Sequence, residues 1–540
     1  MARILYHCRD LNRPSGGVRR LYRHIEILTK HNYPASILHD RQGFRVKWFD
    51  SPAPIGYVST DMNFTADDIL VIPEGHTDIM ASTVFLPCRR VIIALNWANI
   101  FASLPVGLDW NSFQISGAIA GSEYEQTFIR ETMGLDSTVI VSGIDSAMFK
   151  PSATKLCQIA FMPRKNARVF HLIASAFRSM FPEFSEVPFV PVDGVSHGQV
   201  AHVLAESAVF LATSFPEGLA RPPLEAMASG CSVVGFAGRG SLEYMEHRKN
   251  CYLAADMDVL NAAQLLGAAL RDFKEGTASV MQKAGRETAL RYSLEREEET
   301  VVTYWGEFLR SAPLVASCPR IHPHVTMGES PDALDRCLGF EDLYDRIVAK
   351  APDDANVVEI GSGLGTSTVY LAQNVRASAK GIHIYAVDNF SASQPLPRLV
   401  PSVSRQGGSV FHAFCENIRA HGLESLVTPV LGDPSLSASR FPDHSVDFVF
   451  VNGHYGSAKI RSDILAWVPK LKPGGGIGGC HYDENHLGVI QAVGELFPSG
   501  RYEIIQCCWL VENPHSSTLA LGNESYLGSH THTQNTLRSC

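Results

Sequence analysis

Short apolar runs alternate with longer helical stretches along the first third of this chain. The apolar runs are Arg3–His7, Ile69–Pro73, Arg90–Leu95 and Gly117–Gly121, and each is followed by loop or helical sequence. The first run leads through a polar loop into a helical pattern that continues to about Lys30. Apolar runs that alternate with helices are typical of strands buried on both faces, so this region predicts a parallel sheet covered by helices.

The same alternation begins again near Gln158. Ile159–Met162, Ala208–Thr213 and Ser232–Phe236 predict strands, and Leu224–Ser229 predicts the start of a helix. The charged segment Ser279–Leu309 predicts further helix. We therefore expect two Rossmann-like domains, at residues 1–150 and 151–310.

A third α/β pattern follows a segment rich in Pro, Ser and His. Its predicted strands are Val357–Ile360, Ile382–Val387, Val427–Leu431 and Val446–Val451, and the run Lys470–Gly476 predicts a sharp turn. The fold class is therefore α/β, with a third Rossmann-like domain at residues 335–512. The remaining predicted segments are a linker at residues 311–334 and a disordered tail at residues 513–540.

Length and charge narrow the class of protein. A chain of 540 residues holds about three domains of ordinary size. Apolar residues make up 45% and charged residues 19%, as in ordinary globular proteins. The net charge of −9 and the absence of a long basic run argue against nucleic acid as the main partner.

The cysteines and the apolar segments indicate the compartment. The twelve cysteines are scattered without a Cys-x-x-Cys pair, which predicts reduced thiols. The N-terminal apolar run is too short for a signal peptide, and no apolar stretch reaches about 18 residues. We expect a cytoplasmic protein, with peripheral contact at the inner face of the membrane left open.

Two carboxylates and a glycine follow the strand predicted at Ala208–Thr213. Glu217 and Glu225 are separated by seven residues, and Gly218 lies just before the predicted helix. Free backbone N–H groups and the positive end of the dipole suit a helix N-terminus to a diphosphate, and glycine permits close backbone approach. Without the surrounding residues, an alternative without a ligand is equally open, in which one acid lies at the helix N-terminus and the other is solvated on the helix.

The surrounding residues resemble a known donor site. Ser-Phe-Pro-Glu-Gly-Leu-Ala-Arg-Pro-Pro-Leu-Glu-Ala-Met-Ala-Ser-Gly, followed by Gly-Arg-Gly-Ser-Leu-Glu, is similar to the donor site of retaining GT-B glycosyltransferases of family four. The resemblance covers roughly residues 1–305 and implies a GT-B pair of Rossmann-like domains with the active site in the cleft. It implies that Glu217 contacts donor-sugar hydroxyls, that Glu225 contacts the ribose, and that the amides of Gly218 and Leu219 lie near the phosphates.

The resemblance also assigns a basic pair and a glycine loop. Arg164 and Lys165 occupy the position where a basic pair neutralises the diphosphate leaving group, although they stand closer together than in most members. Gly16 and Gly17 match the glycine loop that lines the cleft, with an ordinary β–α turn as the alternative. His76 lies where some members carry a cleft histidine, but we expect a structural loop histidine there rather than a contact with substrate.

A second glycine-rich loop follows the strand predicted at Val357–Ile360. Its glycines are Gly361, Gly363 and Gly365, so the spacing is Gly-x-Gly-x-Gly and differs from the Gly-x-Gly-x-x-Gly of dinucleotide sites. Asp388 ends the next strand, 23 residues after Gly365, where a carboxylate can take both ribose hydroxyls. This combination predicts a donor that has a ribose but no phosphate, and S-adenosylmethionine is such a donor.

The wider region resembles class I S-adenosylmethionine-dependent methyltransferases, particularly the group with macrolide sugar O-methyltransferases. Asp-Phe-Val-Phe-Val-Asn-Gly and Trp-Val-Pro-Lys-Leu-Lys-Pro-Gly-Gly carry the resemblance, over about residues 335–510. It implies that Glu359 belongs to the cofactor loop and that Asp433 lies near the adenine.

One departure concerns the metal of this group. Metal-dependent relatives read Ile-Asp-Gly-Asp-His and later His-Asp-Tyr, where this chain has Val-Asn-Gly-His-Tyr at 451–455 and Cys-His-Tyr at 480–482. The exchanges remove two anionic ligands that Mg²⁺ favours, so we expect no metal. His454 or His481 is then the candidate general base for a sugar hydroxyl, and Asp483 can bind a cation or orient a histidine.

Together these patterns predict a bifunctional enzyme of surface polysaccharide biosynthesis. One part transfers a sugar from a nucleotide sugar to a glycan or lipid-linked glycan, and the other O-methylates a sugar hydroxyl with S-adenosylmethionine. Two alternatives remain open. One is a glycosyltransferase with a degenerate methyltransferase-like scaffold, and the other is a methyltransferase whose GT-B part only holds a glycan.

Overall fold

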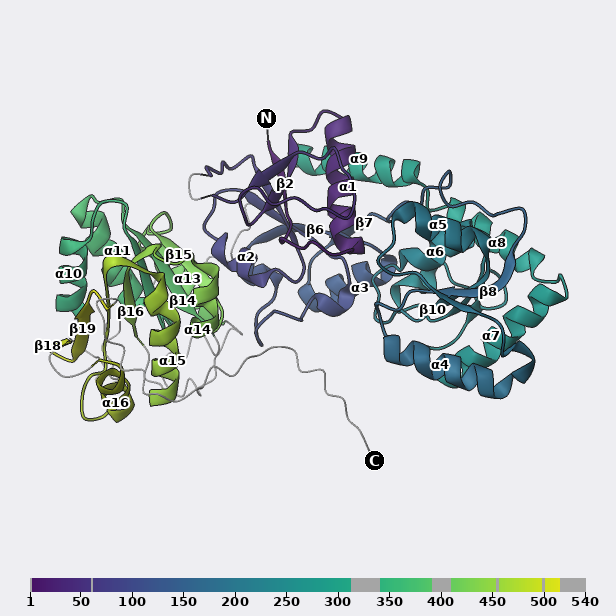
Figure 1. The fold of residues 1–540 in the computed structure, drawn as a ribbon. Helices are drawn as coiled ribbons and strands as arrows, with labels where there is room; N and C mark the ends of the chain where they lie inside the picture. Colours follow the sequence, from purple (N-terminus) through teal and green to yellow (C-terminus); the bar gives the residue numbers. More distant parts are fainter. Residues whose placement is uncertain are drawn as a thin grey trace. The chain divides into compact units, whose positions relative to one another are not determined.

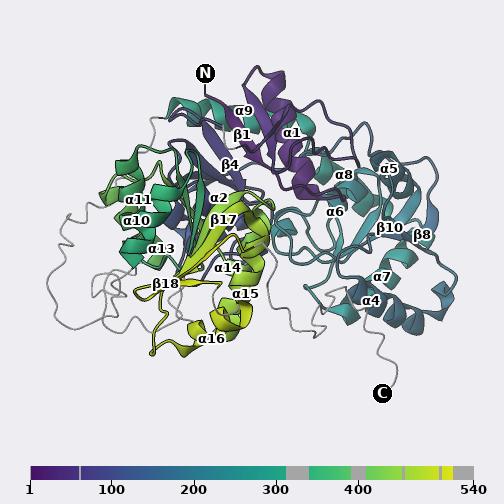
Figure 2. The ribbon, with the colours of Figure 1, turned by 60° about the vertical axis from the view of Figure 1, so that its left-hand side comes forward.

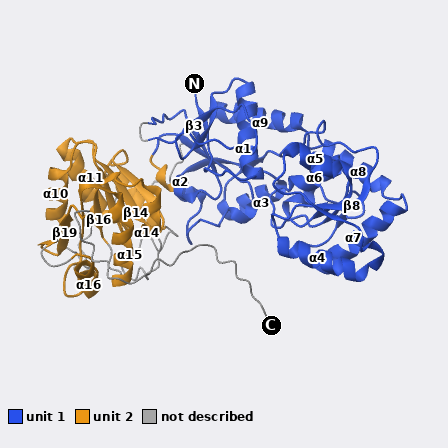
Figure 3. Ribbon diagram, viewed as in Figure 1, with its two compact units in different colours: residues 1–80, 86–321 blue, residues 81–85, 322–540 orange. Residues whose placement is uncertain are grey.

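Two compact units make up the chain. The computed structural model describes residues 2–59, 62–311, 340–390, 409–452, 456–497 and 501–514. The first unit is Met1–Met80 with Leu86–Ile321, and the second is Ala81–Phe85 with His322–Cys540 (Figure 3). The first unit contains two parallel sheets and the second contains one mixed sheet, which confirms the predicted α/β class with three Rossmann-like parts.

The first sheet has seven parallel strands in the order β3-β2-β1-β4-β5-β6-β7. Strand β1 pairs in parallel with both β2 and β4. The strands β2 and β3 are therefore added on one side of β1, and β4 to β7 on the other side. The strands are β1 Ile4–His7, β2 Ala35–His39, β3 Ile55–Tyr57, β4 Ile69–Pro73, β5 Arg89–Ile93, β6 Ile115–Ala120 and β7 Ser137–Val139, and the helices are α1 Gly16–Lys30, α2 Thr77–Ser82 and α3 Glu123–Met133 (Figure 1).

The second sheet has five parallel strands in the order β12-β11-β10-β8-β9. Its strands are β8 Leu156–Phe161, β9 Phe189–Pro191, β10 Ser207–Ala212, β11 Ser232–Gly235 and β12 Tyr252–Leu253. Its helices are α4 Ala167–Met180, α5 His197–Glu206, α6 Arg221–Ala228, α7 Val259–Lys274 and α8 Ser279–Leu290. Helix α6 begins three residues before the predicted Leu224, because Pro222 and Pro223 are well suited to a first helical turn.

The last helix of the first unit packs on the first sheet. This helix, α9 (Leu294–Arg310), lies beside α1 (Figure 2). Its Trp305 belongs to the core of the first sheet, and Trp305 Nε1 donates to the hydroxyl of Tyr6 at 3.2 Å. The boundary predicted at residue 310 therefore places α9 in the second domain, although α9 packs in the core of the first domain. Periodicity marks an apolar helix face but does not say which sheet covers it.

The sheet of the second unit has the order β15-β14-β13-β16-β17-β19-β18. Strand β19 is antiparallel to both of its neighbours, and the other pairs are parallel. Helices α10, α11 and α13 cover one face, and α14, α15 and α16 the other (Figure 2). The elements are β13 Asn356–Ile360, β14 His383–Asp388, β15 Val427–Leu431, β16 Val446–Val451, β17 Leu471–Gly479, β18 Glu503–Ile505, β19 Cys508–Glu512, α10 Phe340–Lys350, α11 Thr366–Ser378, α13 Val410–Ala420, α14 Pro434–Ser437, α15 Ser457–Trp467 and α16 Leu487–Leu496.

The turn predicted at Lys470–Gly476 is wrong in one respect, because β17 runs through it. The pairing of β16 with β17 shifts register between the pairs Val446–Leu471 and Phe448–Gly476. Gly474 has φ +84° within this irregularity. The glycines therefore form a bulge inside a strand, and a bulge carries the same Pro and Gly signal as a turn between strands.

Some predictions concern segments at the limits of the structure. Residues 312–334 of the predicted linker and residues 515–540 of the predicted tail lie outside the described residues. Eight described cysteines are free thiols, whereas Cys507 forms a disulfide, so the expectation of reduced thiols does not hold at that residue. Within the described ranges, no helix is long and apolar enough to cross a membrane.

Candidate functional sites

The loop after β10 brings two of the predicted residues together. Lys165 lies between β8 and α4, and its Nζ donates to Oε1 of Glu217. Strands β8 and β10 are neighbours in the parallel sheet, so the loops that follow them meet at the same edge. The side chain of Glu217 is 12% exposed and that of Lys165 is 38% exposed. An acid and a cation are therefore paired at the carboxyl end of the second sheet.

Both domains of the first unit bind the backbone around Glu217. From the second domain, Glu217 N donates to the carbonyl of Gly238 at 2.9 Å. From the first domain, Asn96 Nδ2 donates to the carbonyl of Pro216 and Trp97 Nε1 donates to the carbonyl of Glu217, both at 3.0 Å. Asn96 and Trp97 were not predicted from the sequence. The sequence feature that could have identified them is their position directly after a predicted strand, because parallel sheets carry their functional loops there.

Glycine is required at two positions of this loop pair. A Cβ at Gly218 would overlap the carboxyl oxygen of Glu125 and would lie 2.8 Å from its Cδ and 3.0 Å from the carbonyl of Leu95. A Cβ at Gly240 would overlap the carbonyl of Gly218. The loops at residues 214–220 and 238–243 thus pack backbone against backbone, which explains the second glycine segment of the motif.

A buried acid lies behind this loop. Glu125 of α3 is fully buried, and its Oε2 accepts from the backbone N–H of Gly121 at 2.6 Å. Its Oε1 has no hydrogen-bond partner in the described part of the chain. Burial raises the pKa of Glu125 to about 8, and the nearby charge of Arg20 offsets this effect only in part. Glu125 was not predicted from the sequence.

Glu225 is held by two basic side chains. It is buried on α6, 3.3 Å from Arg221 of the same helix and 3.5 Å from His197 of α5. Burial raises the pKa of Glu225, but the hydrogen bond from His197 and the charge of Arg221 outweigh it and lower the pKa below its ordinary value. Glu225 is therefore an anion with two partners, neither of which the motif indicated. Its contact with a ribose remains a prediction.

The two residues of the predicted basic pair, Arg164 and Lys165, bind different partners. Lys165 pairs with Glu217, whereas Arg164 donates to the carbonyl of Pro14, at 2.8 Å, in the loop before α1. Gly16 and Gly17 form the first turn of α1 rather than a free loop. A Cβ at Gly16 would meet nothing within 4 Å, so the space beside this turn is open. Leu219 packs against the core of the second domain.

His76 belongs to a cluster at the carboxyl edge of the first sheet. Its Nδ1 shares a hydrogen bond of 3.0 Å with Nδ1 of His7, and Nε2 of His7 lies 2.8 Å from a carboxylate oxygen of Asp40. Burial, reinforced by the charge of His7, lowers the pKa of His76 to about 3. His76 is therefore neutral near pH 7.

In the second unit, the glycine loop after β13 meets the acid at the end of β14. The backbone N–H of Gly363 donates to Oδ2 of Asp388 at 2.9 Å, and that of Phe390 donates to Oδ1 at 2.7 Å. Burial raises the pKa of Asp388, and these backbone hydrogen bonds partly counter the effect. Gly361 and Gly365 have φ of +82° and +87°, and a Cβ at Gly365 would lie 2.8 Å from the ring of Phe414.

Two other predicted cofactor residues have internal partners. Glu359 is fully buried, and its carboxylate accepts from the hydroxyls of Tyr344, at 2.6 Å, and Thr368. These two hydrogen bonds connect β13 to α10 and to α11. Asp433 caps α14 by accepting from the N–H of Leu436 at 3.2 Å, and it forms an ion pair with Lys459 at 3.2 Å. The contacts of these two acids with the cofactor remain predictions.

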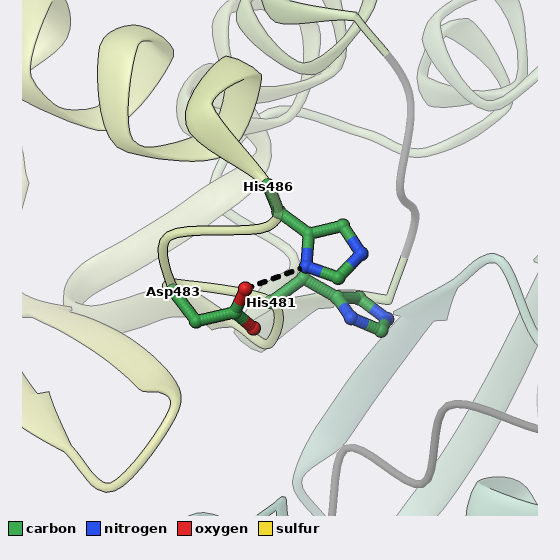
Figure 4. Close-up of side chains that lie close together, drawn as sticks. All are labelled: His481, Asp483 and His486. Atoms are coloured by element: carbon green, nitrogen blue, oxygen red, sulfur yellow. Dashed lines mark hydrogen bonds and ion pairs between the residues drawn. The ribbon is translucent and has the colours of Figure 1, made fainter. Parts of the chain in front are cut away.

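The positions that correspond to metal ligands in related enzymes have other contacts here. The amide of Asn452 donates to Ser367 Oγ at 3.0 Å and accepts from Cys480 Sγ at 2.8 Å. This set of donors does not fit Mg²⁺, which prefers carboxylate oxygens and water. His454 lies outside the described residues. His481 is buried directly after β17, beside a paired Asp483 and His486 (Figure 4).

Two families of known proteins match this chain, one in each of its two compact units. A family model described as glycosyl transferases group 1 matches residues 186–272, and one described as a methyltransferase domain matches residues 358–479. The chain is a transferase with glycosyltransferase and methyltransferase domains. The glycosyltransferase match contains the loop of Glu217 and Glu225, and the methyltransferase match contains the loop of Gly361–Gly365 with Asp388.

Individual proteins are similar to part of this chain. A curated alpha-1,6-glucosyltransferase of Actinobacillus pleuropneumoniae serotype 7 (strain AP76) is 28% identical over 240 residues, which are 43% of this chain and 72% of the relative. Among solved structures, a sucrose-phosphate synthase of Thermosynechococcus elongatus has a TM-score of 0.47 at 12% identity and covers 58% of this chain and 100% of its own. Anabaena HepE in complex with UDP-glucose has a TM-score of 0.43 at 16% identity, with coverage of 57% and 100%.

Proposed function

We propose that the glycosyltransferase unit transfers a hexose from a nucleoside diphosphate sugar to a glycan or lipid-linked glycan, with retention of configuration. The observation that carries this proposal is the pairing of Lys165 with Glu217 at the carboxyl edge of the second sheet. The name of the curated relative favours glucose as the hexose. The first domain, which supplies Asn96 and Trp97, would hold the acceptor.

The pairing suggests how the site exchanges partners when donor binds. Without donor, Lys165 neutralises Glu217. With donor, Lys165 would turn to the diphosphate, whose negative charge grows as the glycosidic bond breaks, and Glu217 would accept from sugar hydroxyls. Each charge thus gains a new partner as it loses the old one, so the exchange does not leave a buried charge unpaired.

For the second unit, we propose S-adenosylmethionine as the methyl donor and a sugar hydroxyl as the acceptor. Both oxygens of Asp388 accept backbone N–H bonds, from Gly363 and from Phe390, and a carboxylate oxygen can accept more than one hydrogen bond, so Asp388 could also take a ribose hydroxyl. A Cβ at Gly363 would meet no atom of the described residues within 4 Å, so the described part of the chain leaves space beside this loop. The bound donor would supply the methyl group, and His481 is the candidate base for the hydroxyl proton.

Two transfers on one chain favour sequential modification of one glycan. Linking the units raises the effective concentration of the first product at the second site. A methyl ether replaces a hydroxyl that further extension needs, so O-methylation would cap a growing surface polysaccharide. The competing interpretation is a glycosyltransferase whose methyltransferase domain acts only as a scaffold.

Calorimetric titration of the full chain tests the proposal and separates these interpretations. We expect S-adenosylmethionine and UDP-glucose each to bind at one site with a dissociation constant in roughly the micromolar range. Glu217→Gln should weaken binding of UDP-glucose alone, and Asp388→Asn should weaken binding of S-adenosylmethionine alone. A chain that binds UDP-glucose but not S-adenosylmethionine would support the scaffold, and loss of both ligands in either variant would contradict independent sites.

A further inference from the structure

Two histidines and a carboxylate converge just beyond β17 in the methyltransferase domain. They are His481, Asp483 and His486, and their ligand atoms all lie within 4.8 Å of one another (Figure 4). The rings of His481 and His486 are 4.5 Å apart between centroids, and His486 Nδ1 lies 2.9 Å from Oδ1 of Asp483. The sequence predicted at most that Asp483 binds a cation or orients a histidine, and His486 was not considered.

These separations suit a shared ion. Imidazole nitrogens and carboxylate oxygens bind zinc at about 2.0–2.2 Å in tetrahedral geometry, so two ligand atoms on one ion are about 3.4 Å apart. Asp483 and His486 are joined by a hydrogen bond of 2.9 Å, so an ion that displaces the shared proton would need only a small separation of the two atoms. Small rotations of the side chains would bring His481 to the same ion.

The backbone at His481 supports a specific role for this residue. His481 has φ +61°, in the left-handed region, which is uncommon for a residue other than glycine. Such backbone conformations cluster at functional sites, where the surrounding structure maintains them. Here the conformation comes two residues after β17, which ends at Gly479, so His481 lies at the end of this strand.

The donor set defines the class of ion. Two imidazoles and one carboxylate are the ligands of zinc and of other divalent transition metals, whereas Mg²⁺ takes oxygen ligands. The cluster shares with related enzymes only the position of His481, because Asp483 and His486 lie outside both motifs that carry their metal ligands. The geometry points to a site at His481, Asp483 and His486 for a divalent transition-metal ion, in place of the Mg²⁺ site of the metal-dependent relatives.

This site revises the expectation of a metal-free domain and bears on His481. A lone pair that binds a metal is not available for a proton, so metal binding and the general-base role are alternatives at the same nitrogen. The metal site does not depend on the proposed methyl transfer. Metal alone is the probe, so either proposal can fail without the other.

The test is titration of the full chain, purified free of metal, with Co²⁺, Zn²⁺ and Mg²⁺ separately. We expect one site per chain for Co²⁺ and Zn²⁺, seen by calorimetry and by the visible absorption of bound Co²⁺, and at least tenfold weaker binding of Mg²⁺. His486→Ala and Asp483→Asn should each weaken Co²⁺ binding at that site by about 10- to 100-fold.

His421→Ala is the matched control, because His421 is an exposed histidine of the same domain. It should leave the number of Co²⁺ ions and their affinity unchanged. Circular dichroism melts of every variant separate the loss of a ligand from the loss of folding, and Asp483→Asn keeps the size of the side chain. The proposal is overturned if the wild-type chain binds no Co²⁺ or Zn²⁺, if folded His486→Ala and Asp483→Asn bind Co²⁺ as tightly as wild type, or if Mg²⁺ binds as tightly as Co²⁺.

Discussion

Substitution of Gly218 by alanine tests whether the donor loop depends on close backbone packing. The added Cβ would lie 2.8 Å from Cδ of Glu125 and 3.0 Å from the carbonyl of Leu95. Ordinary contacts between carbon atoms are about 3.5–4.0 Å, so the Cβ is about 1 Å too close to the buried carboxyl group. Glu125 cannot swing into solvent because it is fully buried, so the loop that carries Glu217 must move instead.

The size of the effect follows from the contacts that this shift disturbs. A displacement of about 1 Å breaks hydrogen bonds between Glu217 and the donor sugar, and a hydrogen bond to a charged group contributes about 1.5–3 kcal/mol. We therefore expect Gly218→Ala to bind the nucleotide sugar about 10- to 100-fold more weakly. Overpacking should also lower the free energy of unfolding by about 1–3 kcal/mol.

Calorimetry with the nucleotide sugar measures the affinity, and urea titration measures the stability. Gly198→Ala is the control, because its Cβ would meet nothing within 4 Å in α5 and alanine favours a helix. Adding Glu125→Ala to Gly218→Ala should recover part of the affinity by removing the overlapping carboxyl group. Wild-type affinity in Gly218→Ala, or no recovery in the double variant, would refute the packing argument.

Three further changes address other parts of the two sites. The folded state keeps the proton on Glu125 up to about pH 8, whereas the unfolded chain loses it near its ordinary pKa of 4.5, so stability should fall as pH rises through this window. Glu125→Gln should remove that slope, as urea midpoints at pH 6 and 8.5 would show, and a wild-type slope in the variant would contradict burial as the cause. Trp97→Phe removes an indole donor to the carbonyl of Glu217 and should weaken nucleotide-sugar binding several-fold without changing methyl-donor affinity. Asp388→Asn should weaken S-adenosylmethionine binding by about 10-fold or more, while Asp353→Asn, at an exposed acid of the same domain, should not.

Local patterns were sufficient for much of the fold. The strands at Ile69–Pro73, Val427–Leu431 and Val446–Val451 were predicted with the bounds that the structure has. Buried parallel strands are nearly continuous apolar runs, so composition over five or six residues identifies them. The order of strands in each sheet, and the packing of α9 on the first sheet, required the tertiary structure because periodicity does not identify the partner of a buried face.

The same division holds for the sites. The two loops with Glu217 and Asp388 were proposed as ligand-binding loops from sequence, because a phosphate or a ribose favours glycines and acids at short spacing after a strand, and their ligand contacts stay predictions. Other features were seen only in the structure, because they involve residues that are distant in sequence or that carry no motif. These features are the pairing of Lys165 with Glu217, the contacts from Asn96 and Trp97, and the cluster around His481. Sequence alone determined which chemical groups this chain carries at its loops, and the tertiary structure decided which of them meet, since contact depends on the register and order of strands that no local pattern encodes.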